Sequence, residues 1–146
     1  MGDASSVDTG QSCPCCQGNV VVLACSGASN VGHLADLATR ELTRRGIARM
    51  GCLAGVAARL PGTLEVVRQA RWIVVLDGCG TQCGTRILKE AGFENVLFLR
   101  VDALGMKRGE TPVNEENVHR LTDAVCQEIG TLCGTTAQDS TDACCR

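Results

Sequence analysis

The stretch "RWIVVLDGCGTQCG", residues 71–84, decides the fold predicted for this chain. Its first half is a continuous aliphatic run, which is typical of a strand buried on both faces of a parallel sheet. Gly and Cys follow at once, so the strand ends in two thiols, Cys79 and Cys83, one helical turn apart. Residues 81–91 then have helical spacing, and Gly92 is placed to end that helix. A strand that leads directly into a helix is the repeating unit of α/β folds.

The same alternation continues on both sides of this stretch. The pattern predicts strands at 19–25, 47–53, 71–78 and 95–101, and helices at 30–45, from 61 or 63 to 70, at 81–91 and at 114–130. Such an order predicts a single three-layer, doubly wound α/β domain with a four-stranded parallel sheet. The expected strand order is 2-1-3-4, which is flavodoxin-like or Rossmann-like.

The two ends of the chain lack periodic apolar positions. Residues 1–18 and 134–146 are therefore predicted to be flexible cysteine-containing arms around an α/β metal-binding domain at 19–133. We expect this domain to fold without the arms. Cys126 is predicted to pack in the last helix, and Cys133 is predicted to be a tail thiol.

Composition narrows the classes of function. The net charge is −2 and no basic cluster is interleaved with aromatic residues, which argues against nucleic acid as a partner. No apolar run approaches the ~20 residues of a membrane span, and the polar start does not resemble a signal peptide, so a cytoplasmic protein without a membrane partner is expected. In a reducing compartment, 11 cysteines indicate metal binding or thiol chemistry.

Four of the cysteines fall at one edge of the predicted sheet. Cys25, Cys52 and Cys79 stand at or near the carboxyl ends of three adjacent strands, and Cys83 lies in the first turn of the next helix. Open α/β sheets bind ligands at this edge. Thiolates suit zinc and other soft metals or metalloids, so these four residues are the predicted metal ligands and the metal ion is the predicted partner. A role as metal carrier or sensor fits this set, and no protein partner is indicated.

Two other interpretations of the same thiols stay open. One is a thiol-disulfide oxidoreductase or another thiol-dependent enzyme, in which Cys79 attacks and Cys83 or Cys25 resolves, although C-x3-C is not the usual C-x-x-C. The other is passive packing, since cysteine is a common buried residue. A cysteine phosphatase loop is disfavoured, because Cys79 to Arg86 is one residue too long for Cys-x5-Arg. Whether the chain is an enzyme is therefore undecided.

The turn after the first strand offers polar groups to the same edge. "GASNVG", residues 27–32, has the spacing of a phosphate loop but lacks the Lys and Ser/Thr that handle phosphates and Mg²⁺. The backbone N–H groups around Gly27 suit thiolates or a small anion better. Ser26 and Ser29 either hydrogen-bond a bound ligand or serve the turn and the helix cap. His33 is either a ligand or proton carrier, or an exposed helix histidine.

Three motifs together are similar to a known family. "DGCGTQC" (77–83), "ACSGASNVGHLA" (24–35) and "GCLAGV" (51–56) resemble the DGC-domain family, which is named for Asp-Gly-Cys and for which zinc binding has been suggested. The resemblance covers about residues 20–130. It implies a site role for Asp77 and metal-ligand roles for Cys25, Cys52, Cys79 and Cys83.

Overall fold

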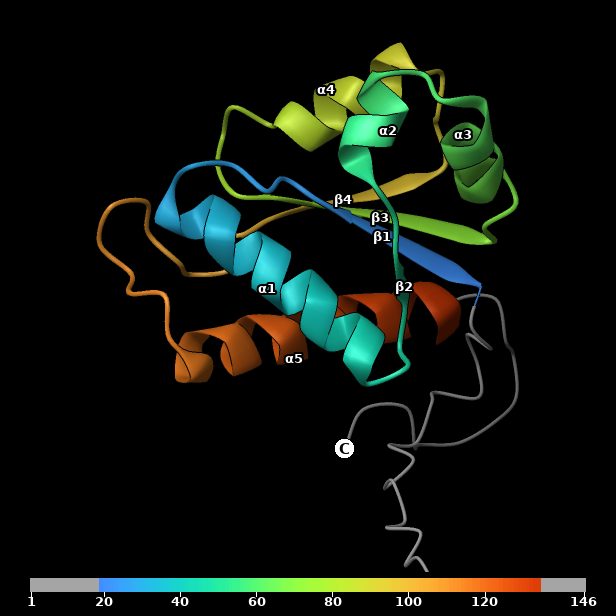
Figure 1. The fold of residues 1–146 in the computed structure, drawn as a ribbon. Helices are drawn as coiled ribbons and strands as arrows, with labels where there is room; N and C mark the ends of the chain where they lie inside the picture. Colours follow the sequence, from blue (N-terminus) through green and yellow to red (C-terminus); the bar gives the residue numbers. More distant parts are fainter. Residues whose placement is uncertain (1–18, 135–146) are drawn as a thin grey trace, which may run out of the picture.

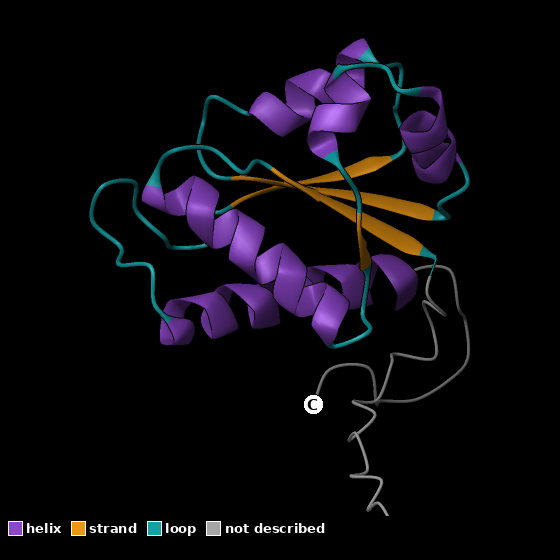
Figure 2. Ribbon diagram, viewed as in Figure 1, coloured by secondary structure: helices purple, strands orange, loops and turns teal. Residues whose placement is uncertain are grey.

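The four apolar runs form one parallel sheet in the computed structural model, which describes residues 19–134 (Figures 1 and 2). The elements in chain order are β1 (Val20–Ala24), α1 (Asn30–Arg44), β2 (Arg49–Met50), α2 (Leu53–Ala57), α3 (Pro61–Arg68), β3 (Trp72–Asp77), α4 (Cys83–Glu90), β4 (Val96–Arg100) and α5 (Glu115–Gly134). The predicted α/β class is confirmed. The arms predicted at either end lie outside the described residues, except for Gly134.

The sheet has the order β2-β1-β3-β4, as predicted from the alternation of strands and helices. The central pair is the most extensive, since β1 runs beside β3 from Val20 opposite Trp72 to Ala24 opposite Leu76. All pairings are parallel, so the carboxyl ends of all four strands lie at one edge. This edge carries the candidate site.

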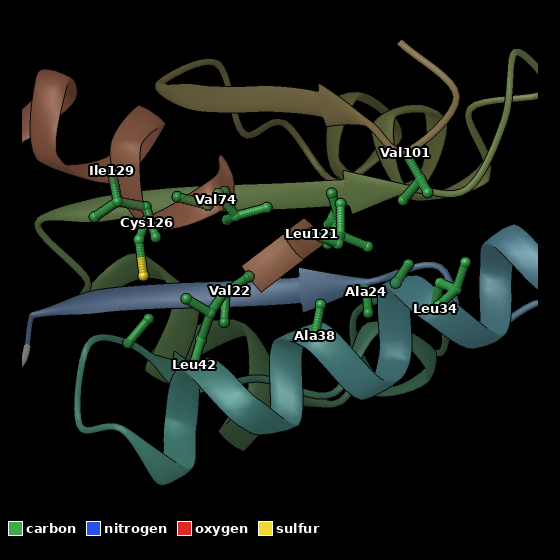
Figure 3. Close-up of a cluster of buried hydrophobic side chains, with 14 of the residues drawn as sticks. Val22, Ala24, Leu34, Ala38, Leu42, Val74, Val101, Leu121, Cys126 and Ile129 are labelled. Carbon is green, nitrogen blue, oxygen red and sulfur yellow. The ribbon is translucent and has the colours of Figure 1, made fainter. Parts of the chain in front are cut away.

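Helices cover both faces of the sheet, with α1 and α5 on one side and α2, α3 and α4 on the other (Figure 1). Alternate strand residues supply the two cores. In β1, Val22 and Ala24 face α1 and α5 (Figure 3), whereas Val21 and Leu23 face the other helices. The same alternation continues one residue past the end of β1, to Cys25.

The predicted strand at 47–53 is much shorter than expected, because the chain leaves the sheet after Met50 and begins α2. Gly51 makes this possible, since a Cβ there would lie 2.8 Å from Cδ2 of Leu23. Cys52 then caps α2, because its sulfur accepts a hydrogen bond from the N–H of Gly55 at 3.4 Å. A helix of this length presents too few apolar positions to be recognised from periodicity.

The start of α4 and the end of α5 differ from the prediction. α4 begins at Cys83 and not at residue 81, because Gln82 has a left-handed backbone with φ of 52°. α5 continues to Gly134, four residues beyond the predicted end at 130. The prediction that Cys133 is a tail thiol is wrong: it is buried, seven residues after the buried Cys126 and thus on the same helical face. The predicted packing of Cys126 is confirmed.

None of the helices between residues 19 and 134 is long and apolar enough to cross a membrane.

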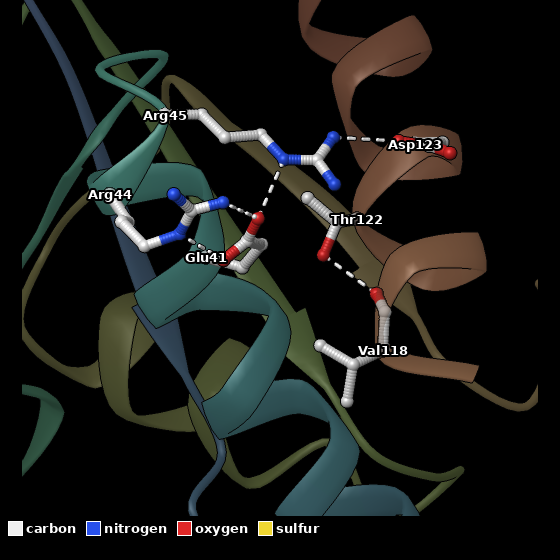
Figure 4. Close-up of polar contacts among 6 residues, drawn as sticks. All are labelled: Glu41, Arg44, Arg45, Val118, Thr122 and Asp123. Carbon is white, nitrogen blue, oxygen red and sulfur yellow. Dashed lines mark hydrogen bonds and ion pairs between the residues drawn. The ribbon is translucent and has the colours of Figure 1, made fainter. Parts of the chain in front are cut away.

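A network of charges joins α1 to α5 (Figure 4). Arg45 donates to Glu41 at 2.9 Å and to Asp123 on α5 at 2.7 Å, and Arg44 also donates to Glu41. The two guanidinium groups, Arg44 first, lower the pKa of Glu41 from 4.5 to about 2, against the opposing effect of burial. Beside this network, the buried hydroxyl of Thr122 donates to the carbonyl of Val118 at 2.7 Å.

The depressed pKa of Glu41 makes stability depend on pH. Its folded pKa lies below the unfolded value, so the stabilisation is present above about pH 4.5 and is lost as pH falls towards 2. We expect E41Q to be about 1 kcal/mol less stable than the parent at pH 7. The difference should shrink as pH falls below about 4.5 and disappear below about pH 2, as measured by denaturant unfolding at several pH values. A difference that stays constant from pH 7 to pH 2 would contradict the assigned role of the Glu41 carboxylate.

Candidate functional site

The carboxyl edge begins at Cys25, which continues the ladder beyond the end of β1. Its N–H donates to the carbonyl of Leu76 at 3.0 Å, so the next residue of β3, Asp77, is level with Cys25. Since Val21 and Leu23 face α2, α3 and α4, alternation places Cys25 on that face too. Asp77 lies on the same face by the same reasoning from Val75.

Asp77 holds the start of α4 against the end of β3. The carboxylate is fully buried and accepts hydrogen bonds from the N–H of Gly84 at 2.7 Å, the N–H of Thr85 at 2.9 Å and the hydroxyl of Thr85 at 2.6 Å. These partners satisfy the first free N–H groups of the helix. Asp77 therefore acts on the site through α4, whose first residue is Cys83.

Cys83 lies close enough to Cys25 to affect the charge of the Cys25 thiol. Partial burial, the largest effect, raises the pKa of the Cys25 thiol, and the nearby Cys83 raises it further. The backbone N–H groups of Gly78 and Gly27 hydrogen-bond the Cys25 sulfur and lower its pKa in part. The N–H group of Gly27, in the turn that was predicted to donate to thiolates or a small anion, thus donates to the Cys25 sulfur.

Glycines bring the two Cys-bearing loops into backbone contact. A Cβ on Gly78 would lie 2.8 Å from the nitrogen of Gly32, in the first turn of α1. A Cβ on Gly32 would in turn lie 2.8 Å from the nitrogen of Gly27. The obstacles are main-chain atoms, which cannot rotate away, so these glycines set how closely the loops after β1 and β3 approach.

Cys79 lies towards the other face of the sheet. It packs against the core cluster formed by α1 and α5, and its thiol donates to the hydroxyl of Thr81 at 3.5 Å. The hydroxyl and the N–H of Thr81 lower the pKa of Cys79, and the positive charge of Arg108 lowers it further. Asp102 opposes this effect but is itself paired with Arg100 at 2.9 Å.

Arg108 belongs to a loop that Asn30 fastens to the start of α1. The Asn30 amide donates to the carbonyls of Lys107 at 3.0 Å and Thr111 at 2.7 Å, and its oxygen accepts from the N–H of Gly109 at 2.7 Å. Sequence reasoning missed this clamp, because its partners lie 77 to 81 residues away. By holding both neighbours of Arg108, Asn30 keeps this loop beside the Cys79 loop.

The remaining candidates have local partners. Ser26 donates to Asp36 at 2.8 Å, and Ser29 caps α1 by accepting from the N–H of Gly32 at 3.2 Å. His33 is exposed on the first turn of α1. Cys52 is exposed and caps α2 through its sulfur. Both serines therefore have the roles in the turn and the helix cap that the sequence left open.

The structure sorts the four predicted thiol ligands into different surroundings. Cys25 and Cys83 lie on the α4 side, Cys79 lies towards α1 and α5, and Cys52 is engaged at α2. All four are free thiols. Within residues 19–134, no three His, Cys, Asp or Glu side chains are grouped closely enough to hold a metal ion.

The surroundings of Cys79 and Cys25 differ, so the two thiols should differ in reactivity. We expect Cys79 to be alkylated by iodoacetamide at lower pH than Cys25, because Thr81 and Arg108 favour its thiolate while burial disfavours that of Cys25. Peptide mass spectrometry over a pH series measures both residues in one sample. T81V should move the midpoint of Cys79 upwards and leave that of Cys25 in place. A parent protein in which Cys25 titrates below Cys79 would refute the assignment.

The fold and the edge together define a class: a parallel α/β domain with cysteines where the strands end. The DGC domain family matches residues 21–125, so the chain belongs to this family, as the three motifs predict. Among curated proteins, the chain is similar to the "Anaerobic and virulence modulator AnvM" of Pseudomonas aeruginosa. The two are 40% identical over 88 residues, which are 60% of this chain and 67% of that protein. No solved structure matches the chain significantly.

Proposed function

We propose that the protein binds zinc or another soft thiophilic metal ion through cysteine thiolates at the carboxyl ends of the strands, as a metal carrier or sensor. The candidate ligands are Cys25, Cys52, Cys79 and Cys83. The observation that carries the proposal is that two free thiols, Cys25 and Cys83, stand at the carboxyl edge on loops that the ladder and the Asp77 bonds fix on the same face. Thiolates are the ligands that select soft metals.

The surroundings of Cys25 support a role for its thiolate. The backbone N–H groups of Gly27 and Gly78 face the sulfur of Cys25. These N–H groups stabilise a negative charge on the sulfur, and they carry no positive charge that would repel a metal ion. Cys83 is exposed at the first turn of α4, where the helix also favours negative charge. Of the two thiols, Cys83 is therefore the more accessible to a metal ion from solvent.

Metal content tests the proposal directly. The full chain, purified under reducing conditions without added metal and without an affinity tag, should carry a soft metal in a fixed ratio by elemental analysis. Alkylation of the thiols before purification should remove it. A protein that carries no soft metal, and takes none up from a weak chelator, would overturn the proposal.

Thiol–disulfide exchange is the second candidate. It needs an attacking and a resolving thiol within reach of each other, and Cys25 with Cys83 meets this need better than Cys79 with Cys83, since Cys79 faces the other core. Counting free thiols after treatment with oxidised dithiothreitol, and again after reduction, distinguishes exchange from metal binding. An intramolecular disulfide that forms and is reduced reversibly, in a protein without metal, would favour this candidate.

A further inference from the structure

We infer that the metal taken up at this edge is a monovalent, two-coordinate thiophilic ion of the Cu(I) class, bound by Cys25 and Cys83 alone, and not a zinc ion bound by four thiolates. The inference rests on the proposed function and names its ligand pair and metal class. It follows from how the fold distributes the four thiols.

The two chosen thiols share one face because of hydrogen bonds that fix both loops. Cys25 is tied to Leu76 through its own N–H at 3.0 Å. Cys83 is the residue before Gly84, whose N–H donates to the Asp77 carboxylate at 2.7 Å. This hydrogen bond fixes the start of α4, and therefore Cys83, on the face of the sheet where Asp77 lies. Both loops are therefore fixed before metal arrives, and little chain entropy is lost on binding.

The other two thiols are engaged elsewhere. The sulfur of Cys52 accepts the N–H of Gly55 and caps α2, so ligation would cost this helix its cap. Cys79 packs towards α1 and α5 and contacts Thr81. The Asp77 carboxylate is buried and already accepts hydrogen bonds from three donors at the start of α4, so ligation would compete with the bonds that hold this helix. A tetrahedral zinc site needs four donors, whereas Cu(I) is satisfied by two thiolates.

Charge also favours a monovalent ion. When Cu(I) binds, two S–H bonds break, two Cu–S bonds form and two protons leave to solvent, so the bis-thiolate complex carries one net negative charge. The N–H groups of Gly27 and Gly78 face this charge, and the first turn of α4 lies beside it. No change of oxidation state is needed.

The test uses the full chain with its five terminal cysteines changed to Ser, so that only the described thiols remain. These positions are Cys13, Cys15, Cys16, Cys144 and Cys145. Cu(I), supplied as its bicinchoninate complex under anaerobic reducing conditions, is the probe, and zinc with a chromophoric chelator is the comparison. Four further single changes to Ser, at Cys25, Cys52, Cys79 and Cys83, are measured beside this parent, with circular dichroism to show that each variant folds.

We expect one Cu(I) per chain, with affinity weakened about 100-fold or more in C25S and C83S and less than about threefold in C52S and C79S. X-ray absorption of the parent should show two sulfur ligands, a result that does not depend on any variant folding. Tight binding that also requires Cys52 or Cys79, or a site with three or four sulfurs, overturns the inference while the proposed function stands. A parent that holds neither Cu(I) nor zinc overturns both.

Discussion

G78A should lose about 3 kcal/mol of folding free energy, among the largest effects of any single methyl group in this chain. The added Cβ would lie 2.8 Å from the nitrogen of Gly32 and 3.0 Å from the carbonyl carbon of Val31. Both are main-chain atoms of α1, so the conflict is relieved only by moving the helix or the loop. Because this contact also positions the N–H of Gly78 against Cys25, the variant should disturb the site as well.

G62A is the matched control, since a Cβ there meets nothing within 4 Å. It lies in the first turn of α3, where alanine is the better helix former, so it should be neutral or slightly stabilising. Urea unfolding of the two variants and the parent measures both effects. If G78A were as stable as G62A, the close approach of the two loops would be wrong.

The second large effect is expected for D77A, at about 3 kcal/mol. The substitution leaves the N–H groups of Gly84 and Thr85 without their acceptor in a buried position, and the Thr85 hydroxyl loses its partner too. Each buried donor left unsatisfied costs about 1–3 kcal/mol. The start of α4 should loosen, and Cys83 with it.

D123A tests whether this effect is specific to the buried carboxylate. Asp123 is also an aspartate with a close partner, Arg45 at 2.7 Å, but its side chain is 63% exposed. Its loss should cost less than about 1 kcal/mol. Hydrogen exchange should show faster opening at the first turn of α4 in D77A alone. Equal stability losses in the two variants would show that Asp77 is not the anchor of α4.

The sheet and its edge could be predicted because the strands coincide with continuous apolar runs in the sequence. Buried parallel strands show this pattern clearly, and helices that alternate with them leave few possible strand orders. The placing of Cys25, Cys52 and Cys79 at one edge followed from that order. By contrast, α2 depends on a close approach at Gly51 and a cap from Cys52, which periodicity does not record.

The internal arrangement of the site could not be predicted from spacing alone. Sequence position shows that Cys79 follows β3, but only the loop conformation shows that it packs towards α1 and α5 while Asp77 and Cys83 lie towards the other helices. The clamp from Asn30 to the loop around Arg108 joins segments nearly 80 residues apart. Contacts of this length arise from packing and leave no local pattern.

Exchanging the two sets of thiols tests the central claim most directly. One full-length variant has its five terminal cysteines changed to Ser, and another has Cys25, Cys52, Cys79 and Cys83 changed to Ser. Both are titrated with zinc and with Cu(I) against competing chelators. We predict that the first variant keeps one tight metal site per chain and that the second loses it. Retention of the tight site by the second variant, with its loss in the first, would contradict the account.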